Sequence, residues 1–288
     1  IKKVGVIGAG TMGAGIAGQV ANAGTEVWLL DLPSNGENVN ILSAKGLERL
    51  KDPDMPGLMS EEAEKLINLG NTRDHFHELE DCDWIAEAVV ERLDIKQALY
   101  RRLNDTCKES TIITSNTSTI PIKLLTEGMP TEFCERFAIT HFFNPVRFMR
   151  LLELVRGEFT RDDVINTLDV FSEINLGKGV VSCSDTPGFL ANRVGVFAIQ
   201  CALHNAFDLK LSPTEADAFF GRPLGLPKTG VFGLYDLIGI DLMADVVKSL
   251  VSILPENDAF HNYSAPIGFM TNMIANGQTG NKNEKGFY

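Results

Sequence analysis

The chain of 288 residues is 44% hydrophobic and 22% charged, which is typical of a folded soluble protein and excludes a disordered or fibrous one. Its formal charge of -12, from 26 basic and 38 acidic side chains, disfavours sequence-independent binding to nucleic acid or to an anionic membrane surface. A single core is hard to extend over this length, so we expect one large domain and one smaller domain.

The cysteines and the apolar stretches indicate the compartment. The five cysteines are widely spaced without a C-x-x-C pair, so we expect no disulfide framework and no metal site, as in a reducing cytoplasm. The longest apolar stretch, residues 194–207, is interrupted by Gln200 and His204, which argues against a membrane span. The chain starts without Met and stops at Tyr288, and we interpret it as part of a longer polypeptide.

Short β-rich apolar runs alternate with amphipathic segments up to about residue 182, which predicts βαβ units and a mainly parallel sheet. The predicted strands cover residues 4–7, 26–30, 83–86, 111–113 and 137–140. Residues 36–68 form a polar insertion that favours helix, with Ser60 as an N-cap before an acidic first turn. Beyond Cys183, turn residues precede long helical patterns without a strand. We therefore predict an α/β domain over 1–184 and an all-α domain over 185–288.

The first predicted strand runs directly into a G-x-G-x-x-G loop, and an apolar helix follows. The loop consists of Gly8, Ala9, Gly10, Thr11, Met12 and Gly13. The loop alone is a weak signal, but the flanking strand and helix, together with Asp31 at the end of the next strand, indicate dinucleotide binding on a Rossmann-like fold. The glycines let a pyrophosphate approach the backbone, and the helix N-terminus supplies N–H donors. Asp31 would accept hydrogen bonds from ribose hydroxyls and repel a 2′-phosphate, which predicts NAD over NADP. A tight turn without a ligand is the alternative.

A histidine and a carboxylate form a candidate proton-transfer pair. His141 follows the fifth predicted strand, and Glu153 lies in an apolar run, where a polar side chain is costly to bury without a partner. A carboxylate on one ring nitrogen fixes the imidazole tautomer and stabilises the cation, as a general base requires when it takes a hydroxyl proton. A structural histidine with an unrelated surface glutamate is the alternative, but the carboxyl end of a strand is where open α/β sheets bind ligands.

Six segments together resemble the 3-hydroxyacyl-CoA dehydrogenases of fatty-acid β-oxidation. They are residues 8–13, 87–91 (E-A-V-V-E), 115–118 (S-N-T-S), 141–145 (H-F-F-N-P), 185–189 (D-T-P-G-F) and 285–288 (K-G-F-Y). They occur in the right order over nearly the whole chain. The resemblance implies NAD-dependent oxidation of an L-3-hydroxyacyl-CoA to the 3-ketoacyl-CoA. It also implies a Rossmann-like domain followed by a helical domain that binds substrate and forms a homodimer.

The resemblance further implies roles for individual residues. His141 is the implied catalytic base, and Glu153 is its orienting partner. Ser118 and Asn192 are implied to hydrogen-bond the reacting oxygen or the cofactor, where donors stabilise the charge that develops during hydride transfer. The remaining positions implied to contact the cofactor are Glu91, Lys96, Asn144 and Lys282.

The segment 31–58 departs from the family pattern. Relatives carry CoA-contacting residues there, and in this chain Lys45, Arg49 and Lys51 are candidates for the CoA phosphates by charge alone. Relatives also occur fused to an enoyl-CoA hydratase module, and the abrupt ends of this chain fit such a fusion.

Two other classes of protein are alternatives to this interpretation. The β-hydroxyacid dehydrogenases share a G-x-G-x-M-G loop, but they resemble one another in a catalytic lysine on the long inter-domain helix. This chain has Asn192 and Arg193 there and no lysine until Lys210. A non-catalytic NAD-binding or lens-type protein could use the same fold, although the intact His141 and Glu153 argue against lost activity.

Overall fold

The computed structural model describes residues 1–225 and 228–288, and the chain divides into two compact units, Ile1–Phe189 and Leu190–Tyr288. The first unit is an α/β structure and the second is helical, which confirms the predicted fold class. The division falls just after the predicted position near residue 184, because Phe189 packs into a core cluster of the first unit.

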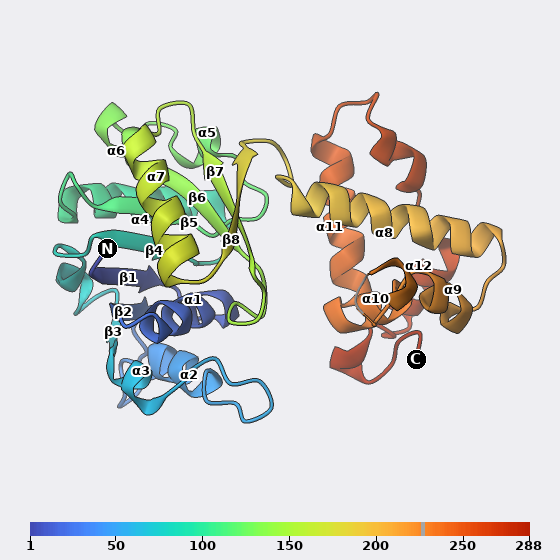
Figure 1. Ribbon diagram of the computed structural model, residues 1–288, viewed down its shortest axis with the longest axis horizontal. Helices are drawn as coiled ribbons and strands as arrows, with labels where there is room; N and C mark the ends of the chain where they lie inside the picture. The colour runs from blue at the N-terminus through green and yellow to red at the C-terminus, as the bar shows by residue number, and fades with distance from the viewer. Residues whose placement is uncertain (226–227) are drawn as a thin grey trace. The chain divides into compact units, whose positions relative to one another are not determined.

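One eight-stranded sheet forms the centre of the first unit, with the strand order β3-β2-β1-β4-β5-β6-β7-β8 (Figure 1). The strands are β1 (Lys3–Ile7), β2 (Glu26–Asp31), β3 (Ile67–Asn71), β4 (Trp84–Glu87), β5 (Ile112–Ser115), β6 (Phe137–Phe142), β7 (Leu151–Arg156) and β8 (Gly179–Ser184). All neighbouring pairs are parallel except β6 and β7. The sequence patterns did not predict β3, β7 and β8. Of these, β3 and β8 are the edge strands, where weak apolar patterning is tolerated.

Helices cover both faces of the sheet, as in a doubly wound fold. One face packs against α1 (Thr11–Asn22), α2 (Ile41–Arg49), α3 (Glu61–Lys65) and α7 (Asp162–Val170), and the other against α4 (Leu93–Thr106), α5 (Ile122–Leu125), α6 (Thr131–Glu135) and the short turn η1 (Phe76–Leu79) (Figure 1). Side chains from alternate strand positions fill the two resulting cores; Val4 and Val6 face the first, and Ile7 faces the second. The Ser60 side chain accepts a hydrogen bond from the Ala63 N–H at 3.2 Å, which confirms the predicted N-cap.

The second unit packs helices around a single apolar core. Its elements are α8 (Ala191–Asp208), α9 (Pro213–Phe219), η3 (Arg222–Leu224), α10 (Phe232–Ile238), α11 (Ile240–Ile253), η4 (Ala259–Tyr263), α12 (Gly268–Ala275) and η5 (Asn281–Asn283). Within residues 190–225 and 228–288 the backbone forms an isolated β-bridge but no strand. Among the described residues, no helix combines the length and apolarity needed to cross a membrane.

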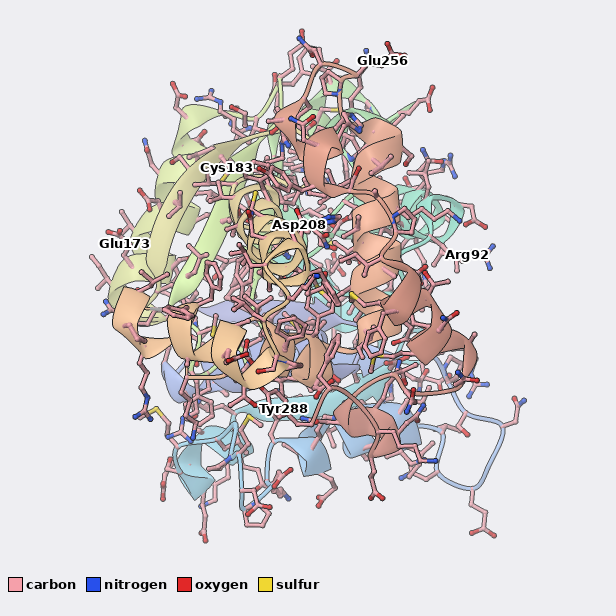
Figure 2. All side chains as sticks on the ribbon, turned by 90° about the vertical axis from the view of Figure 1, so that its right-hand side faces the viewer. Arg92, Glu173, Cys183, Asp208, Glu256 and Tyr288 are labelled. Carbon is pink, nitrogen blue, oxygen red and sulfur yellow. The ribbon has the colours of Figure 1, made fainter. Side chains whose placement is uncertain are left out.

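Two aspartates of the second unit form hydrogen bonds with the K-G-F-Y segment, residues 285–288. The buried Asp236 carboxylate accepts hydrogen bonds from the N–H groups of Phe287 at 2.9 Å and Tyr288 at 3.0 Å. The Tyr288 hydroxyl, on the residue labelled in Figure 2, donates to Asp217 at 2.8 Å. A Cβ on Gly286 would lie 2.0 Å from an Asp236 oxygen, so only glycine fits there. The motif therefore has a structural role in this unit.

Replacing Asp236 by Asn should lower the free energy of unfolding by about 1.5 to 3 kcal/mol, because the amide cannot accept two N–H groups as the carboxylate does. Urea unfolding followed by circular dichroism measures the loss. Asp245→Asn, at an exposed position on α11, is the matched control and should change stability by less than about 0.5 kcal/mol. Equal stability of the two variants would contradict this role of Asp236.

Candidate active site

Polar groups gather at one edge of the sheet, where β1, β4, β5 and β6 end. These four strands are parallel, so the loops that follow them emerge at the same edge. The glycine loop follows β1, residues 88–92 follow β4 and residues 116–121 follow β5, while His141 lies near the end of β6. Ligands of open α/β sheets bind at this edge.

The glycine loop has the shape of a phosphate cradle. Gly8 has φ +101, and a Cβ there would lie 2.4 Å from the Ala88 carbonyl oxygen. A Cβ on Gly13 would lie 1.7 Å from the Gly8 oxygen, whereas one on Gly10 would meet nothing within 4 Å. The first N–H groups of α1, which begins after Gly10, have no intrahelical acceptors. This open space in front of a helix N-terminus fits the pyrophosphate of a dinucleotide.

Asp31 ends β2 beside the glycine loop. Its Oδ2 accepts a hydrogen bond from the Ala9 N–H at 2.6 Å, and its Oδ1 accepts one from the Leu32 N–H at 2.6 Å. The Arg49 guanidinium donates to the Ala9 carbonyl at 3.2 Å. The carboxylate therefore lies next to the glycine loop, and the ribose contact expected from the motif stays a prediction.

His141 and Glu153 lie directly opposite each other on β6 and β7. They are register partners of the antiparallel pair, and His141 Nδ1 lies 2.7 Å from Glu153 Oε2. Glu153 is fully buried, and His141 is 7% exposed. Because an ionised carboxylate can only accept, Nδ1 is the donor in this contact, and a neutral imidazole then carries its lone pair on Nε2. The predicted contact between these two side chains is confirmed.

Aromatic rings and a thiol surround this pair. The Phe143 ring centroid lies 4.5 Å from that of His141, and the Phe189 centroid lies 5.7 Å from it. Phe189 lies in the D-T-P-G-F segment and has φ +47. Cys183 of β8, labelled in Figure 2, donates its thiol to Glu153 Oε1 at 3.7 Å. The low exposure of His141 and Glu153 strengthens the hydrogen bond between them.

Glu91 and Lys96, both predicted to contact a cofactor, contact each other. The Lys96 ammonium is 1% exposed and lies 3.3 Å from a Glu91 oxygen. Hydroxyls of Thr117 and Thr119 also donate to Glu91. Burial opposes ionisation of Glu91, but Lys96 and these hydroxyls outweigh burial and lower the pKa of its carboxyl group. Glu91 is 39% exposed and can reach a ligand, whereas Lys96 lies beneath it.

The other predicted residues lie in three places. Ser118 is half-buried in the loop after β5, and Asn144 is exposed after β6. Asn192 on α8 and Lys282 in η5 belong to the second unit, where the Lys282 ammonium pairs with Asp241 at 2.6 Å. Among the described residues, no group of His, Cys, Asp or Glu side chains could hold a metal ion.

Three further polar groups were not predicted from the sequence: the buried Glu87 and Lys178, and the half-buried Asp185, which follows β8. Glu87 ends β4 fully buried, and Lys178 donates to the carbonyls of Val146 and Met149 in the loop after β6. Burial lowers the pKa of the Lys178 ammonium to about 8. Asp185 accepts from the Ile122 N–H at 2.9 Å and caps α5. The E-A-V-V-E and D-T-P-G-F segments contain two of these groups, so the motifs themselves were the available signal.

Comparison with known proteins identifies one family along the chain. A family model described as "3-hydroxyacyl-CoA dehydrogenase, NAD binding domain" matches residues 3–186, and one described as "3-hydroxyacyl-CoA dehydrogenase, C-terminal domain" matches residues 188–288. The chain belongs to the 3-hydroxyacyl-CoA dehydrogenase family. Its first unit is the NAD-binding domain, and its cofactor is NAD. The resemblance inferred from the six segments is thus confirmed.

Relatives of this chain include single dehydrogenases and longer proteins. A probable 3-hydroxyacyl-CoA dehydrogenase of Deinococcus radiodurans is 39% identical, with all of this chain and 82% of that protein covered. A solved (S)-3-hydroxybutyryl-CoA dehydrogenase from Ralstonia eutropha is 31% identical with a TM-score of 0.81, covering 100% of this chain and 98% of that one. A Rickettsia prowazekii protein named as a fatty acid oxidation complex trifunctional enzyme is 42% identical, and the chain spans 40% of its length.

Two glycine substitutions should separate folding from NAD binding. Gly13→Ala should destabilise the first unit, because its Cβ would overlap the Gly8 oxygen. Gly10→Ala should change the free energy of unfolding by at most about 1 kcal/mol, yet weaken NAD binding at least about tenfold by filling the cradle. Thermal unfolding and calorimetric titration with NAD measure the two effects. Unchanged NAD affinity of Gly10→Ala would contradict the assignment of the cradle.

Proposed function

We propose that this chain oxidises an L-3-hydroxyacyl-CoA to the 3-ketoacyl-CoA with reduction of NAD, as one step of fatty-acid β-oxidation. The observation that carries the proposal is the buried His141–Glu153 pair at the sheet edge that also carries the glycine loop. The names of the relatives support the same reaction class.

In this mechanism His141 moves the proton. NAD, when bound at the glycine loop, supplies the acceptor for the hydride that leaves the carbon bearing the hydroxyl. The lone pair on His141 Nε2 takes the hydroxyl proton, and the Glu153 carboxylate at 2.7 Å stabilises the resulting imidazolium. In the reverse direction the imidazolium returns the proton to the carbonyl oxygen. Because Glu153 is fully buried, its charge is only weakly screened by solvent.

Two polar side chains, one in each unit, are proposed to assist this step. Ser118 supplies a hydroxyl donor from the loop after β5, and Asn192 supplies an amide from α8. Either donor would stabilise negative charge on the reacting oxygen. Glu91, Asn144 and Lys282 are proposed to contact the cofactor.

The CoA part of the substrate requires cations. Lys45 and Arg49 are exposed one turn apart on α2, and Arg49 already borders the glycine loop. Lys51 forms ion pairs with Glu48 at 3.1 Å and Glu64 at 2.7 Å, which makes it the weakest of the three candidates. We propose that Lys45 and Arg49 bind CoA phosphates.

We also propose a larger assembly and a compartment. The helical unit exposes large apolar side chains, among them Val194, Leu242 and Phe269, which supports homodimerisation through this unit. The trifunctional names of the longer relatives support covalent fusion to an enoyl-CoA hydratase module. The five free thiols suit a cytoplasmic location.

Variants of the proton-transfer pair test the mechanism by NADH formation from 3-hydroxybutyryl-CoA. His141→Ala should lower kcat by about 10² to 10⁴-fold, because no base remains. Glu153→Gln should lower kcat by at least about 10²-fold, since an amide neither fixes the tautomer nor stabilises the cation. The exposed His77→Ala and Glu158→Gln variants are controls and should retain wild-type turnover. Unchanged turnover in His141→Ala would overturn the mechanism.

Asp31 should decide the choice between NAD and NADP. Asp31→Ala removes the charge that repels a 2′-phosphate, so the ratio of kcat/KM for NADP to that for NAD should rise at least about tenfold. Steady-state kinetics with both cofactors measure this ratio, and Asp105→Asn, exposed on α4, should leave it unchanged. A wild-type preference for NADP would refute this role for Asp31.

A further inference from the structure

The buried Glu87 carboxylate at the end of β4 receives four hydrogen bonds. Lys96 donates to Oε1 at 2.6 Å and the Val89 N–H donates to it at 2.8 Å. Tyr100 donates to Oε2 at 2.5 Å and Ser115 donates to it at 2.7 Å. Glu87 is 0% exposed, so it cannot touch a ligand bound at the sheet edge. A buried carboxylate is costly without partners, and here a cation and three neutral donors meet it.

Lys96 connects Glu87 to Glu91. The ammonium lies 2.6 Å from Glu87 Oε1 and 3.3 Å from Glu91 Oε2, so the cation lies between two carboxylates. Only Glu91 of the three charged groups is exposed enough to meet a cofactor. The position of the Glu91 carboxylate therefore depends on how strongly Glu87 holds Lys96.

Glu87 also connects to the segments that carry Ser118 and His141. The Ser115 hydroxyl that donates to Glu87 accepts from the Thr117 N–H at 3.2 Å. The Glu87 carbonyl accepts from the Asn116 N–H at 2.8 Å. The Asn116 side chain in turn accepts from the Phe142 N–H at 2.9 Å.

We propose that Glu87 is a positioning residue for the NAD site, acting on Glu91 through Lys96 and on the loop after β5 through Ser115. The proposal rests on the proposed function for its kinetic readout, although NAD binding can be measured without a substrate. Burial and the neighbouring Glu87 raise the pKa of Tyr100, so its phenol stays protonated and keeps donating.

Neutralising Glu87 should affect binding more than chemistry. In Glu87→Gln the buried ammonium of Lys96 keeps Glu91 as its one carboxylate partner among the described residues, so it draws Glu91 inward, away from the cofactor. The His141–Glu153 pair lies on other strands and keeps its contact. The amide oxygen of this variant can still accept from the Ser115 hydroxyl, so the loop that carries Ser118 keeps its place. The KM for NAD should therefore rise while kcat at saturating NAD stays close to wild type.

The experiment compares Glu87→Gln with Tyr100→Phe. Both variants change the hydrogen bonds of the buried residue 87. Tyr100→Phe, however, keeps the charge of the Glu87 carboxylate and the contact of that carboxylate with Lys96. Glu87→Gln should raise the KM and the calorimetric Kd for NAD at least about tenfold, with kcat within about threefold. Tyr100→Phe should lower Tm yet leave both values for NAD within about twofold.

The NAD affinities of these variants distinguish a positioning role of Glu87 from a merely structural one. Equal NAD affinity of Glu87→Gln and wild type, or an equal loss in Tyr100→Phe, would overturn the positioning role. If Glu87→Gln does not fold, Glu87→Asp takes its place, because it keeps the charge but withdraws it by one methylene. That variant should raise the Kd for NAD several-fold, and an unchanged Kd would overturn the proposal. A wild-type protein that binds NAD but does not oxidise 3-hydroxybutyryl-CoA would refute the proposed function and leave this inference standing on the Kd.

Discussion

The parallel alignment of β1, β4, β5 and β6 is the constraint on which the site depends. Parallel strands end at one edge, so the loops that follow them meet there although they are far apart in the chain. Backbone groups at these ends have no further partner in the sheet and need other acceptors and donors. The Glu87 and Asn116 contacts satisfy part of this need within the protein, and the N-terminus of α1 leaves donors for an anion.

The one antiparallel pair in the sheet, β6 and β7, positions the side chains of His141 and Glu153. The reversal between β6 and β7 places His141 and Glu153 opposite each other, with side chains on the same face. A cross-strand pair is more rigid than a contact between loops, because both backbones are fixed by ladder hydrogen bonds. The contact with Glu153 therefore favours one tautomer of the imidazole.

Local groups, and not the net charge, decide where this protein can bind a phosphate. The net charge of -12 disfavours polyanions, yet the family binds a dinucleotide and its relatives act on CoA thioesters. The glycine loop resolves the conflict because helix N–H groups and close backbone approach bind phosphate without a lysine. Two cations near this edge already have partners within the protein. Lys96 contacts two glutamates, and the Arg49 guanidinium donates to the Ala9 carbonyl.

The sequence by itself determined the fold class and predicted the glycine loop and the contact between His141 and Glu153, because each depends on local patterns: strand, glycine loop, helix, and a polar residue in an apolar run. It did not determine that β7 is antiparallel, that Lys96 is buried between two carboxylates, or that Asp236 holds the last residues. These features were decided only in the tertiary structure, since strand direction and burial depend on which distant segments pair. No local pattern encodes the partner of a side chain, because hydrogen bonds such as those of Glu87 join residues brought together only by folding.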